Sequence, residues 1–374
     1  MRYKLLHIIG GGEFGGAEEH VITLLTNIDK NLFDPYLICL CRGPLEEVAK
    51  NYGINVVTID MNSNSPLSVI SKIRSFIYKN NIDLVHTHGL RANFLGRIAS
   101  YISKRKIITT VHSAVKLDYD SKIKAYIALL LNLSTSPLAT KIIAVSNSIK
   151  KDLIDMGINE KKIEVIYNGI DYKKYENPMN KEKFCKIYNL DPNYPIVSVI
   201  ARLHPVKGHK YFLEAAKKIL NTKPKVQFLL VGDGPLRKQL MEYTDKLGLK
   251  KNVKFIGYYS PVKDVLNAID ILCLPSLMEG MGIVILESFY FSKPVVATSV
   301  GGIPEVIEDN KTGLVVSPQN PDEIANKILL LLDNPDLFNI IITNARERLK
   351  DFSLDNMVKK TENLYLKLLK KGEI

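Results

Sequence analysis

The sequence has few cysteines, and none of them has the spacing of a metal or redox motif. Its four cysteines are Cys39, Cys41, Cys185 and Cys273, and no C-x-x-C occurs. This pattern argues against a disulfide framework and a cysteine zinc site. Cys39, Cys41 and Cys273 lie in apolar runs typical of strands, so we expect them to be small core residues in a reducing compartment.

A long hydrophobic run is also missing. No apolar stretch reaches the roughly 18 residues that a membrane span needs. The first ten residues lead directly into a glycine loop, so they are typical of a first β-strand rather than of a signal peptide. We therefore expect a cytoplasmic protein.

Acidic residues are outnumbered by basic ones. The chain carries 51 Lys and Arg against 39 Asp and Glu, a net charge of +12, and the excess is spread over both halves. Such a balance suits anionic small molecules or an anionic membrane surface. We find no known nucleic-acid-binding motif, so we expect no nucleic-acid partner and allow for peripheral contact with the inner membrane face.

What the sequence does contain is a regular alternation of strand and helix patterns, repeated in both halves. Several of the strands are nearly continuous runs of Val, Ile and Leu, as in parallel sheets buried on both faces. This predicts two doubly wound α/β domains. We place an N-terminal domain at 1–170, a C-terminal domain at 171–352 and a final helix at 353–374 that returns toward the N-terminal domain.

The segment E-G-M-G-I-V-I-L-E follows a predicted strand and opens a helix. Gly280 and Gly282 allow a sharp turn, and the amides that follow would form an anion site at the helix N-terminus. Glu287 lies among apolar residues, where a carboxylate needs partners. Ribose hydroxyls would satisfy it, and so would backbone amides.

A second segment, A-R-L-H-P-V-K-G, follows the predicted strand near 195–203. Arg202 and Lys207 would lie at the carboxyl end of that strand, where two cations could hold a diphosphate and neutralise it as a leaving group. The alternative is that both are solvated surface bases.

The first predicted strand ends in a glycine loop with the spacing G-x-G-x-x-G at Gly10, Gly12 and Gly15. This spacing occurs in dinucleotide-binding proteins, and Arg42 after the second strand could accommodate NADP. An NADP-dependent oxidoreductase is therefore an alternative, although no hydride-transfer constellation follows. A loop that approaches a sugar or phosphate and a simple strand-to-helix turn are the other interpretations.

Three histidines and two aspartates complete the candidates. His112 ends a predicted strand at the edge where ligands bind. His86 and His88 also end a strand but lack acidic or cysteine company, so we do not expect a metal there. Asp118 and Asp120 form D-x-D in a polar stretch, which we interpret as surface charge.

Taken in order, these segments resemble glycosyltransferase family 4, whose members have the GT-B fold and retain the anomeric configuration. The motifs are Gly15–Glu18, Val111–Ser113, Val145–Ser148, Val165–Asp171, Arg202–Gly208, Val231–Pro235, Glu279 with Glu287, and Thr298–Glu305. They extend over nearly the whole chain.

The resemblance implies a role for each matched residue. Arg202 and Lys207 would bind the donor diphosphate, Glu287 the ribose, and Glu279 the donor sugar near its reacting carbon. The remaining matches are the amides of Met281, Gly282 and Ile283, the hydrogen-bonding His112, Gly15 and Gly16 at the reaction centre, Gly232 in the substrate-binding set, and Asn168 and Gly169 at the domain crossing.

The resemblance further implies a retaining transfer of a sugar from a nucleotide diphosphate, with UDP favoured, to a glycan or lipid-linked acceptor. Polysaccharide or glycoconjugate synthesis at the cell surface would be the setting, and no metal cofactor is expected. Glu279 would act as a nucleophile or as an electrostatic stabiliser. A nucleotide-sugar epimerase of the same fold is a second alternative.

Overall fold

The structure of the protein is a computed structural model that describes residues 2–12, 14–113 and 122–370. Asp118 and Asp120 lie outside the described residues. The chain forms two compact units. The first unit comprises Met1–Gly169 and Leu354–Ile374, and the second unit comprises Ile170–Ser353.

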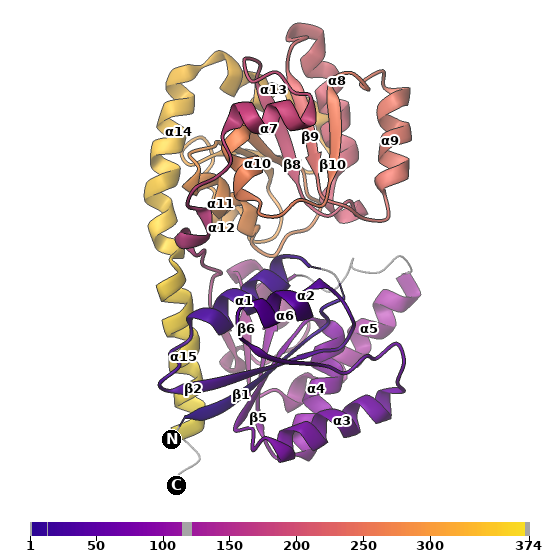
Figure 1. Cartoon of the computed structure of the whole chain (residues 1–374), viewed down its shortest axis with the longest axis vertical. Helices are drawn as coiled ribbons and strands as arrows, with labels where there is room; N and C mark the ends of the chain where they lie inside the picture. Colours follow the sequence, from indigo (N-terminus) through magenta and orange to yellow (C-terminus); the bar gives the residue numbers. More distant parts are fainter. Residues whose placement is uncertain (1, 13, 114–121, 371–374) are drawn as a thin grey trace. The chain divides into compact units, whose positions relative to one another are not determined.

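The first unit is built on a sheet of seven parallel strands in the order β3-β2-β1-β4-β5-β6-β7. Figure 1 labels β1, β2, β5 and β6 of this sheet. Its strands are β1 (Tyr3–Ile9), β2 (Phe33–Cys39), β3 (Asn55–Thr58), β4 (Leu84–His88), β5 (Lys106–Val111), β6 (Lys141–Ala144) and β7 (Ile163–Val165). Its helices are α1 (Gly16–Asn27), α2 (Pro44–Asn51), α3 (Pro66–Lys79), α4 (Leu90–Ile102), α5 (Lys122–Thr135), α6 (Asn147–Asp155) and α15 (Leu354–Lys370). The sequence analysis missed β7, a three-residue strand in which the charged Glu164 lies between two apolar residues.

Alternation along the strands gives this sheet two covered faces. Leu6 and Ile8 of β1 point to the face that packs against α3 and α4. Leu5 and Ile9 point to the opposite face, which α1, α2 and α15 cover. Because successive side chains of a strand point to opposite faces, His7 shares the face of Leu5 and Ile9.

Local sequence explains where the covering helices begin, as α3 illustrates. The Ser65 hydroxyl accepts a hydrogen bond from the Ser68 amide at 3.3 Å, and Pro66 occupies the first turn, where its missing N–H costs nothing. Val69, Ile73 and Ile77 then recur every fourth residue and are fully buried. One face of α3 therefore belongs to the core.

The second unit repeats the architecture with six parallel strands in the order β10-β9-β8-β11-β12-β13. They are β8 (Ile196–Ile200), β9 (Gln227–Val231), β10 (Val253–Gly257), β11 (Ile271–Leu274), β12 (Val295–Thr298) and β13 (Leu314–Val316). The helices are α7 (Lys181–Tyr188), α8 (His209–Thr222), α9 (Arg237–Lys246), α10 (Lys263–Ala268), α11 (Ile283–Tyr290), α12 (Ile303–Val306), α13 (Pro321–Asp333) and α14 (Pro335–Arg348). The predicted pair of doubly wound α/β units is confirmed.

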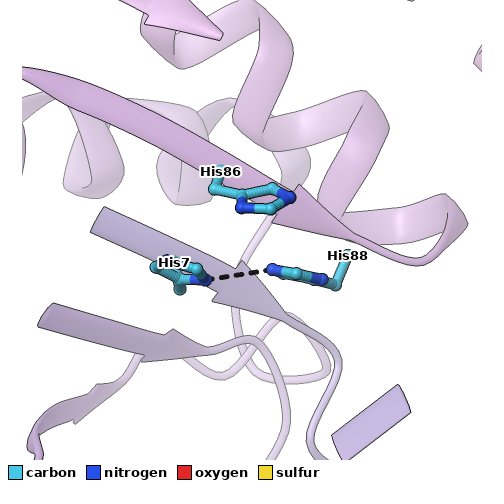
Figure 2. A group of neighbouring side chains, drawn as sticks. All are labelled: His7, His86 and His88. Atoms are coloured by element: carbon cyan, nitrogen blue, oxygen red, sulfur yellow. Dashed lines mark hydrogen bonds between the residues drawn. The ribbon is translucent and has the colours of Figure 1, made fainter. Parts of the chain in front are cut away.

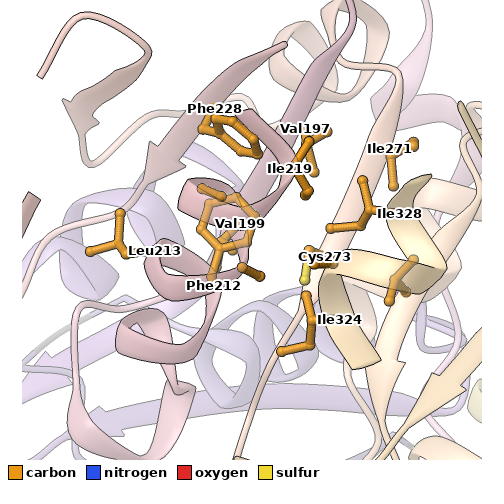
Figure 3. Close-up of a cluster of buried hydrophobic side chains, with 14 of the residues drawn as sticks. Val197, Val199, Phe212, Leu213, Ile219, Phe228, Ile271, Cys273, Ile324 and Ile328 are labelled. Carbon is orange, nitrogen blue, oxygen red and sulfur yellow. The ribbon is translucent and has the colours of Figure 1, made fainter. Parts of the chain in front are cut away.

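The core of the second unit lies between its sheet and α8 and α13. Figure 3 shows Phe212 and Ile219 of α8 facing Val197, Phe228 and other strand residues. Cys273 is buried in this cluster, and all four cysteines are buried thiols. This agrees with the expectation that Cys39, Cys41 and Cys273 are small core residues.

No single helix among the described residues is long and apolar enough to cross a membrane. The segments Pro321–Asp333 and Pro335–Phe352 meet the length and composition criteria only as a pair bent by 100°. Ile324, Ile328 and Ile341 from this pair are fully buried in the core of the second unit.

Candidate functional site

The topology of the second sheet marks a ligand-binding edge. Strand order reverses between the neighbouring strands β8 and β11, and open α/β sheets bind ligands beyond the carboxyl ends of the strands at such a point. The loop after β8 carries Arg202 and Lys207, and the loop after β11 carries Glu279. The charged residues identified in the sequence thus lie on the two loops at the switch point.

Lys207 and Glu279 form an ion pair between these loops. Lys207 Nζ lies 2.6 Å from Glu279 Oε1, and the Ser276 hydroxyl donates to the same oxygen at 3.0 Å. The two side chains are only 23% and 11% exposed, so solvent screens this pair less than a surface pair. The structure therefore holds a cation and the predicted sugar-contacting carboxylate in one place.

Two glycines let neighbouring loops pack directly on this pair. Gly208 has φ +66°, and a Cβ there would lie 1.9 Å from the carbonyl oxygen of Pro275. Gly301, in the loop after β12, has φ +56°, and its Cβ would lie 1.8 Å from the carbonyl oxygen of Glu279. Any other residue at either position would both clash and be strained, so the backbone contacts at the site depend on glycine.

Helix α11 begins at Ile283, four residues after Glu279. Gly282 caps it with φ +77°, Ile283 is its first residue, and Met281 is 1% exposed. The amides at a helix start have no partner within the helix and lie at the positive end of its dipole. Met281, Gly282 and Ile283 are thus placed where their amides can meet a phosphate or sugar hydroxyls.

Glu287, inside α11, is 9% exposed and lies among buried residues. Its Oε1 accepts a hydrogen bond from the hydroxyl of Tyr175 at 2.9 Å. Tyr175 belongs to the short 3-10 helix Tyr172–Tyr175 and is itself buried. A protein hydroxyl is therefore a partner of one oxygen of this carboxylate.

Arg202 and Gly232 occupy the loops after β8 and β9. Arg202 is exposed. A Cβ at Gly232, whose φ is +133°, would lie 2.0 Å from the carbonyl oxygen of Ala201, the residue before Arg202. Hydrogen bonds from Ala201 N to Val231 O at 3.0 Å and from Leu203 N to Asp233 O at 2.9 Å join the same loops. Gly232 supports the backbone that carries Arg202.

The first unit presents Gly15, Gly16 and His112 at the carboxyl ends of β1 and β5. Gly15 caps α1, and its amide donates to Glu18 Oε2 at 3.2 Å. Gly16 is the first residue of that helix. His112 follows β5 directly, and His88 at the end of β4 lies beside it.

His112 belongs to a cluster of five histidines on one face of the first sheet. His7 Nδ1 lies 3.0 Å from His88 Nε2, and His88 Nδ1 lies 3.1 Å from His112 Nε2. Figure 2 shows His7 on β1 facing His88 on β4, with His86 above them. The ring of His20, on α1, lies 4.9 Å from that of His112 between centroids.

Burial keeps these imidazoles neutral. It lowers the pKa of His7 to about 3, with the nearby His20 and Lys30 acting in the same direction. It lowers the pKa of His20 to about 4. Burial, reinforced by the other histidines, also lowers the pKa of His86, His88 and His112 well below the usual 6.5. These imidazoles are therefore uncharged near neutral pH, in contrast to the Lys207–Glu279 ion pair of the second unit.

The remaining sequence candidates are placed as follows. Arg42, the candidate NADP ligand, is exposed, and its Nε lies 4.0 Å from Asp60 Oδ2. Gly169 ends the N-terminal part of the first unit, and its amide donates to Met357 Sδ at 3.3 Å. His86 belongs to one triad, His7–His86–His88, and His88 belongs to this triad and to a second one, His20–His88–His112; the ligand nitrogens within each triad lie within 4.8 Å of one another.

Sequence reasoning missed four residues that contact the candidates. Tyr175, His7, His20 and Tyr365 are far from the motifs they touch. The H-x-H spacing at His86 and His88 could have indicated that both rings share one face of a strand. No local signal could have shown that β1, α1 and α15 bring further rings to that face.

Comparisons with known proteins agree with the two-unit architecture. The family model "Glycosyltransferase Family 4" matches residues 14–174, and "Glycosyl transferases group 1" matches residues 180–348. An uncharacterised glycosyltransferase of Methanocaldococcus jannaschii is 30% identical over 79% of this chain and 78% of its own. The UDP-Gal:alpha-D-GlcNAc-diphosphoundecaprenol alpha-1,3-galactosyltransferase of Escherichia coli is 28% identical over 98% of both chains.

Solved structures give the same result. HepE of Anabaena in complex with UDP-glucose matches with a TM-score of 0.84 and 25% identity, covering 97% of this chain and 99% of its own. A glycosyltransferase of Rickettsia africae matches with a TM-score of 0.80 and 28% identity over 99% of both chains. The protein is thus a glycosyltransferase of the GT-B fold. Within that class, the chain belongs to glycosyltransferase family 4.

Proposed function

We propose that the enzyme transfers a sugar from a UDP-sugar to a glycan or lipid-linked acceptor with retention of configuration. The observation that carries this proposal is the Lys207–Glu279 ion pair beside the start of α11 at the switch point of the second unit. HepE, which is similar over nearly its whole length, was solved with UDP-glucose. The similar enzyme of Escherichia coli is named for a UDP-sugar and a lipid-linked acceptor.

The second unit would bind the donor. Arg202 and Lys207 would contact the diphosphate, because cations close to developing negative charge stabilise it more in the transition state than in the ground state. Glu287 would accept hydrogen bonds from ribose hydroxyls while Tyr175 holds its Oε1. The amides of Met281, Gly282 and Ile283 would complete the donor site.

In the reaction, the bond between the anomeric carbon and the diphosphate oxygen breaks, and the acceptor oxygen forms the new bond on the same face. The acceptor proton passes to the departing diphosphate. Lys207 and Ser276 both engage Oε1 of Glu279. This arrangement favours Glu279 as a fixed negative charge beside the electron-poor sugar carbon over a role as nucleophile. We propose that no metal ion is needed, because Arg202 and Lys207 supply the positive charge.

We further propose that the acceptor belongs to cell-surface polysaccharide or glycoconjugate synthesis and that the enzyme works in the cytoplasm, with peripheral membrane contact. Helix α5 exposes Tyr126, Ile127, Leu130 and Leu131, by 63%, 51%, 48% and 41%. Such an apolar surface on a basic protein suits an anionic bilayer. Flotation with anionic vesicles at low salt tests this contact, and protein that stays wholly in solution would contradict it.

A thermal-shift screen with UDP-, GDP- and ADP-sugars, NADPH and free nucleotides tests the donor. A ligand at 100 times its dissociation constant adds about 2.7 kcal/mol to stability. We expect a shift with a UDP-sugar that Arg202→Ala weakens. A shift with NADPH alone would support the oxidoreductase, and conversion of the sugar without an acceptor would support the epimerase. The comparisons favour neither alternative.

A further inference from the structure

The histidine cluster of the first unit contains a continuous hydrogen-bonded chain that the proposed reaction does not yet use. The chain runs from Tyr365 on α15 through His7 and His88 to His112. The Tyr365 hydroxyl lies 3.3 Å from His7 Nε2, and the next two links are 3.0 and 3.1 Å between ring nitrogens. It crosses β1 and β4, which are the switch point of the first sheet.

The register of the sheet explains why these rings meet. In the parallel pairing of β1 with β4, His7 lies opposite His86 and Ile9 lies opposite His88. His88 in turn lies opposite Thr110 of β5, two residues before His112. Since side chains alternate between faces, the imidazoles of these three strands all point to the face that α15 covers with Tyr365.

Because the imidazoles are neutral, the hydrogen bonds that connect Tyr365, His7, His88 and His112 must all run in the same direction. A neutral imidazole carries one N–H donor and one bare acceptor nitrogen. Where two ring nitrogens face each other, one must donate and the other must accept. His7 and His88 each use both nitrogens in the chain, so the direction of one link determines the direction of the next.

Tyr365 sets that direction. Its hydroxyl lies 2.6 Å from His86 Nδ1 and 3.3 Å from His7 Nε2, and it has one proton to donate. Hydroxyl donors make shorter bonds than ring N–H donors, so the short link is the one in which Tyr365 donates to His86. Burial raises the pKa of Tyr365 well above 10, so this proton is retained. His86 then donates from Nε2 to the Thr110 hydroxyl at 2.7 Å.

The directions of the remaining hydrogen bonds follow from this donation by Tyr365. Tyr365 accepts from His7 Nε2–H, which leaves His7 Nδ1 bare to accept from His88 Nε2–H. His88 Nδ1 is then bare and accepts from His112 Nε2–H.

We propose that Tyr365, His7 and His88 are positioning residues that fix His112 as the tautomer with a bare Nδ1, and that this nitrogen accepts a hydrogen bond from a substrate hydroxyl. This role rests on the proposed sugar transfer.

The same nitrogens could instead turn toward a metal ion, because His7, His86 and His88 meet the distance requirement for a site. The hydrogen bonds argue against that arrangement. Both nitrogens of His86 are engaged by Tyr365 and Thr110, and His7 and His88 are engaged with each other. An ion would have to break these bonds.

The tautomer can be measured directly by two-bond 1H–15N NMR correlation on 15N-histidine-labelled protein at neutral pH, with His112→Asn used to assign His112. In the wild-type enzyme we expect a protonated Nε2 and a bare Nδ1 at His112. A protonated Nδ1 there would overturn the proposal. This result does not depend on catalysis, so it is separate from any failure of the proposed transfer.

Tyr365→Phe removes the group that sets the direction while retaining the ring. We expect a mixture of His112 tautomers and a fall in kcat of about tenfold, with the dissociation constant of UDP unchanged. Tyr36→Phe, which removes the hydroxyl bonded to Asp34 on β2, is the matched control and should change neither property. An unchanged His112 tautomer in Tyr365→Phe would contradict the proposal.

A zinc titration tests the competing arrangement on the wild-type protein. We expect one equivalent of zinc chloride to leave the His7 and His88 resonances and the melting temperature unchanged. Saturable binding of one zinc ion per protein molecule that shifts the His7 and His88 resonances together would contradict the proposed hydrogen-bond network.

Discussion

The two units share one architecture and differ in the chemistry at their switch points. The second unit places Lys207 Nζ 2.6 Å from Glu279 Oε1. The first unit places neutral imidazoles at the equivalent edge, held uncharged by burial. A fixed charged site suits an ionic ligand such as a diphosphate. A neutral site suits hydroxyls, which need a donor or an acceptor but no charge.

The largest expected effect comes from removing the cation of the second unit. Lys207→Ala leaves the Glu279 carboxylate without its ion-pair partner and, under the proposed function, removes the cation that would face the leaving group. We expect kcat to fall by about three orders of magnitude, as for other fixed electrostatic groups. Steady-state kinetics with the donor found in the thermal-shift screen measures this. Lys210→Ala, which removes a 61% exposed lysine near Glu214, is the control and should retain activity.

Lowering the pH should destabilise the first unit before the second. The folded pKa values of His7 and His20, about 3 and about 4, lie below the unfolded value of 6.5. Between the folded pKa values and 6.5, the unfolded chain binds more protons than the folded protein. The stability that is present above pH 6.5 is therefore lost as the pH falls. Each such histidine costs about 1.4 kcal/mol per pH unit, so at pH 5 we expect a total loss of at least about 4 kcal/mol.

Hydrogen exchange followed by mass spectrometry at pH 7 and pH 5 locates this loss. Among the described residues, five of the six histidines whose pKa burial lowers lie in the first unit. The sixth, His209 of the second unit, has a pKa lowered to about 4. Protection should therefore fall first in β1, β4 and β5. Earlier loss of protection in the second unit would contradict the predicted difference in acid sensitivity between the two units.

Gly301→Ala tests whether backbone contact positions the charged site. The new Cβ would lie 1.8 Å from the carbonyl oxygen of Glu279 in a backbone conformation that side chains disfavour. We expect a loss of roughly 2 to 4 kcal/mol in stability, from strain and displacement together, and weaker donor binding. Chemical denaturation and donor titration measure the two effects.

Gly157→Ala separates strain from displacement. Gly157 has φ +87° but nothing lies within 4 Å of its added Cβ. This variant should lose about 1 to 2 kcal/mol from strain alone and bind the donor normally. Equal effects on donor binding in both variants would show that displacement of Glu279 is not the cause.

The smallest effect concerns the partner of the buried carboxylate. Tyr175→Phe removes the hydroxyl that donates to Glu287 Oε1 at 2.9 Å and leaves the ring packing in place. We expect the dissociation constant for UDP to rise about tenfold, because a hydrogen bond to a charged group contributes about 1.5 kcal/mol or more. Tyr172→Phe, whose hydroxyl donates to Leu349 O at 3.5 Å, is the control. Unchanged UDP affinity in Tyr175→Phe would remove Glu287 from the ribose-binding role.

The sequence predicted the architecture well because buried parallel strands have a distinctive pattern. Runs such as Ile196–Ile200 and Ile271–Leu274 are apolar on both faces, and loops of glycine and charge follow them. Arg202, Lys207 and Glu279 could be placed at the carboxyl ends of strands for the same reason, since each follows such a strand. β7 gave no comparable signal, because the charged Glu164 lies between its two apolar residues.

Contacts between distant segments could not be predicted in this way. Tyr175 lies 112 residues from Glu287, and Tyr365 lies 279 residues from His86. Their pairing depends on strand order and on where α15 packs, neither of which is written in a local pattern. The H-x-H spacing could have indicated that the rings of His86 and His88 share one face, but only the sheet register adds His7 and His112 to them.

Isothermal titration of UDP into matched variants of the two units tests the central claim, that the charged site of the second unit binds the nucleotide and the neutral site of the first does not. Lys207→Ala should weaken UDP binding at least tenfold, whereas His112→Asn should leave it within a factor of two. Equal loss in both variants, or no UDP binding by the wild-type protein, would contradict the account.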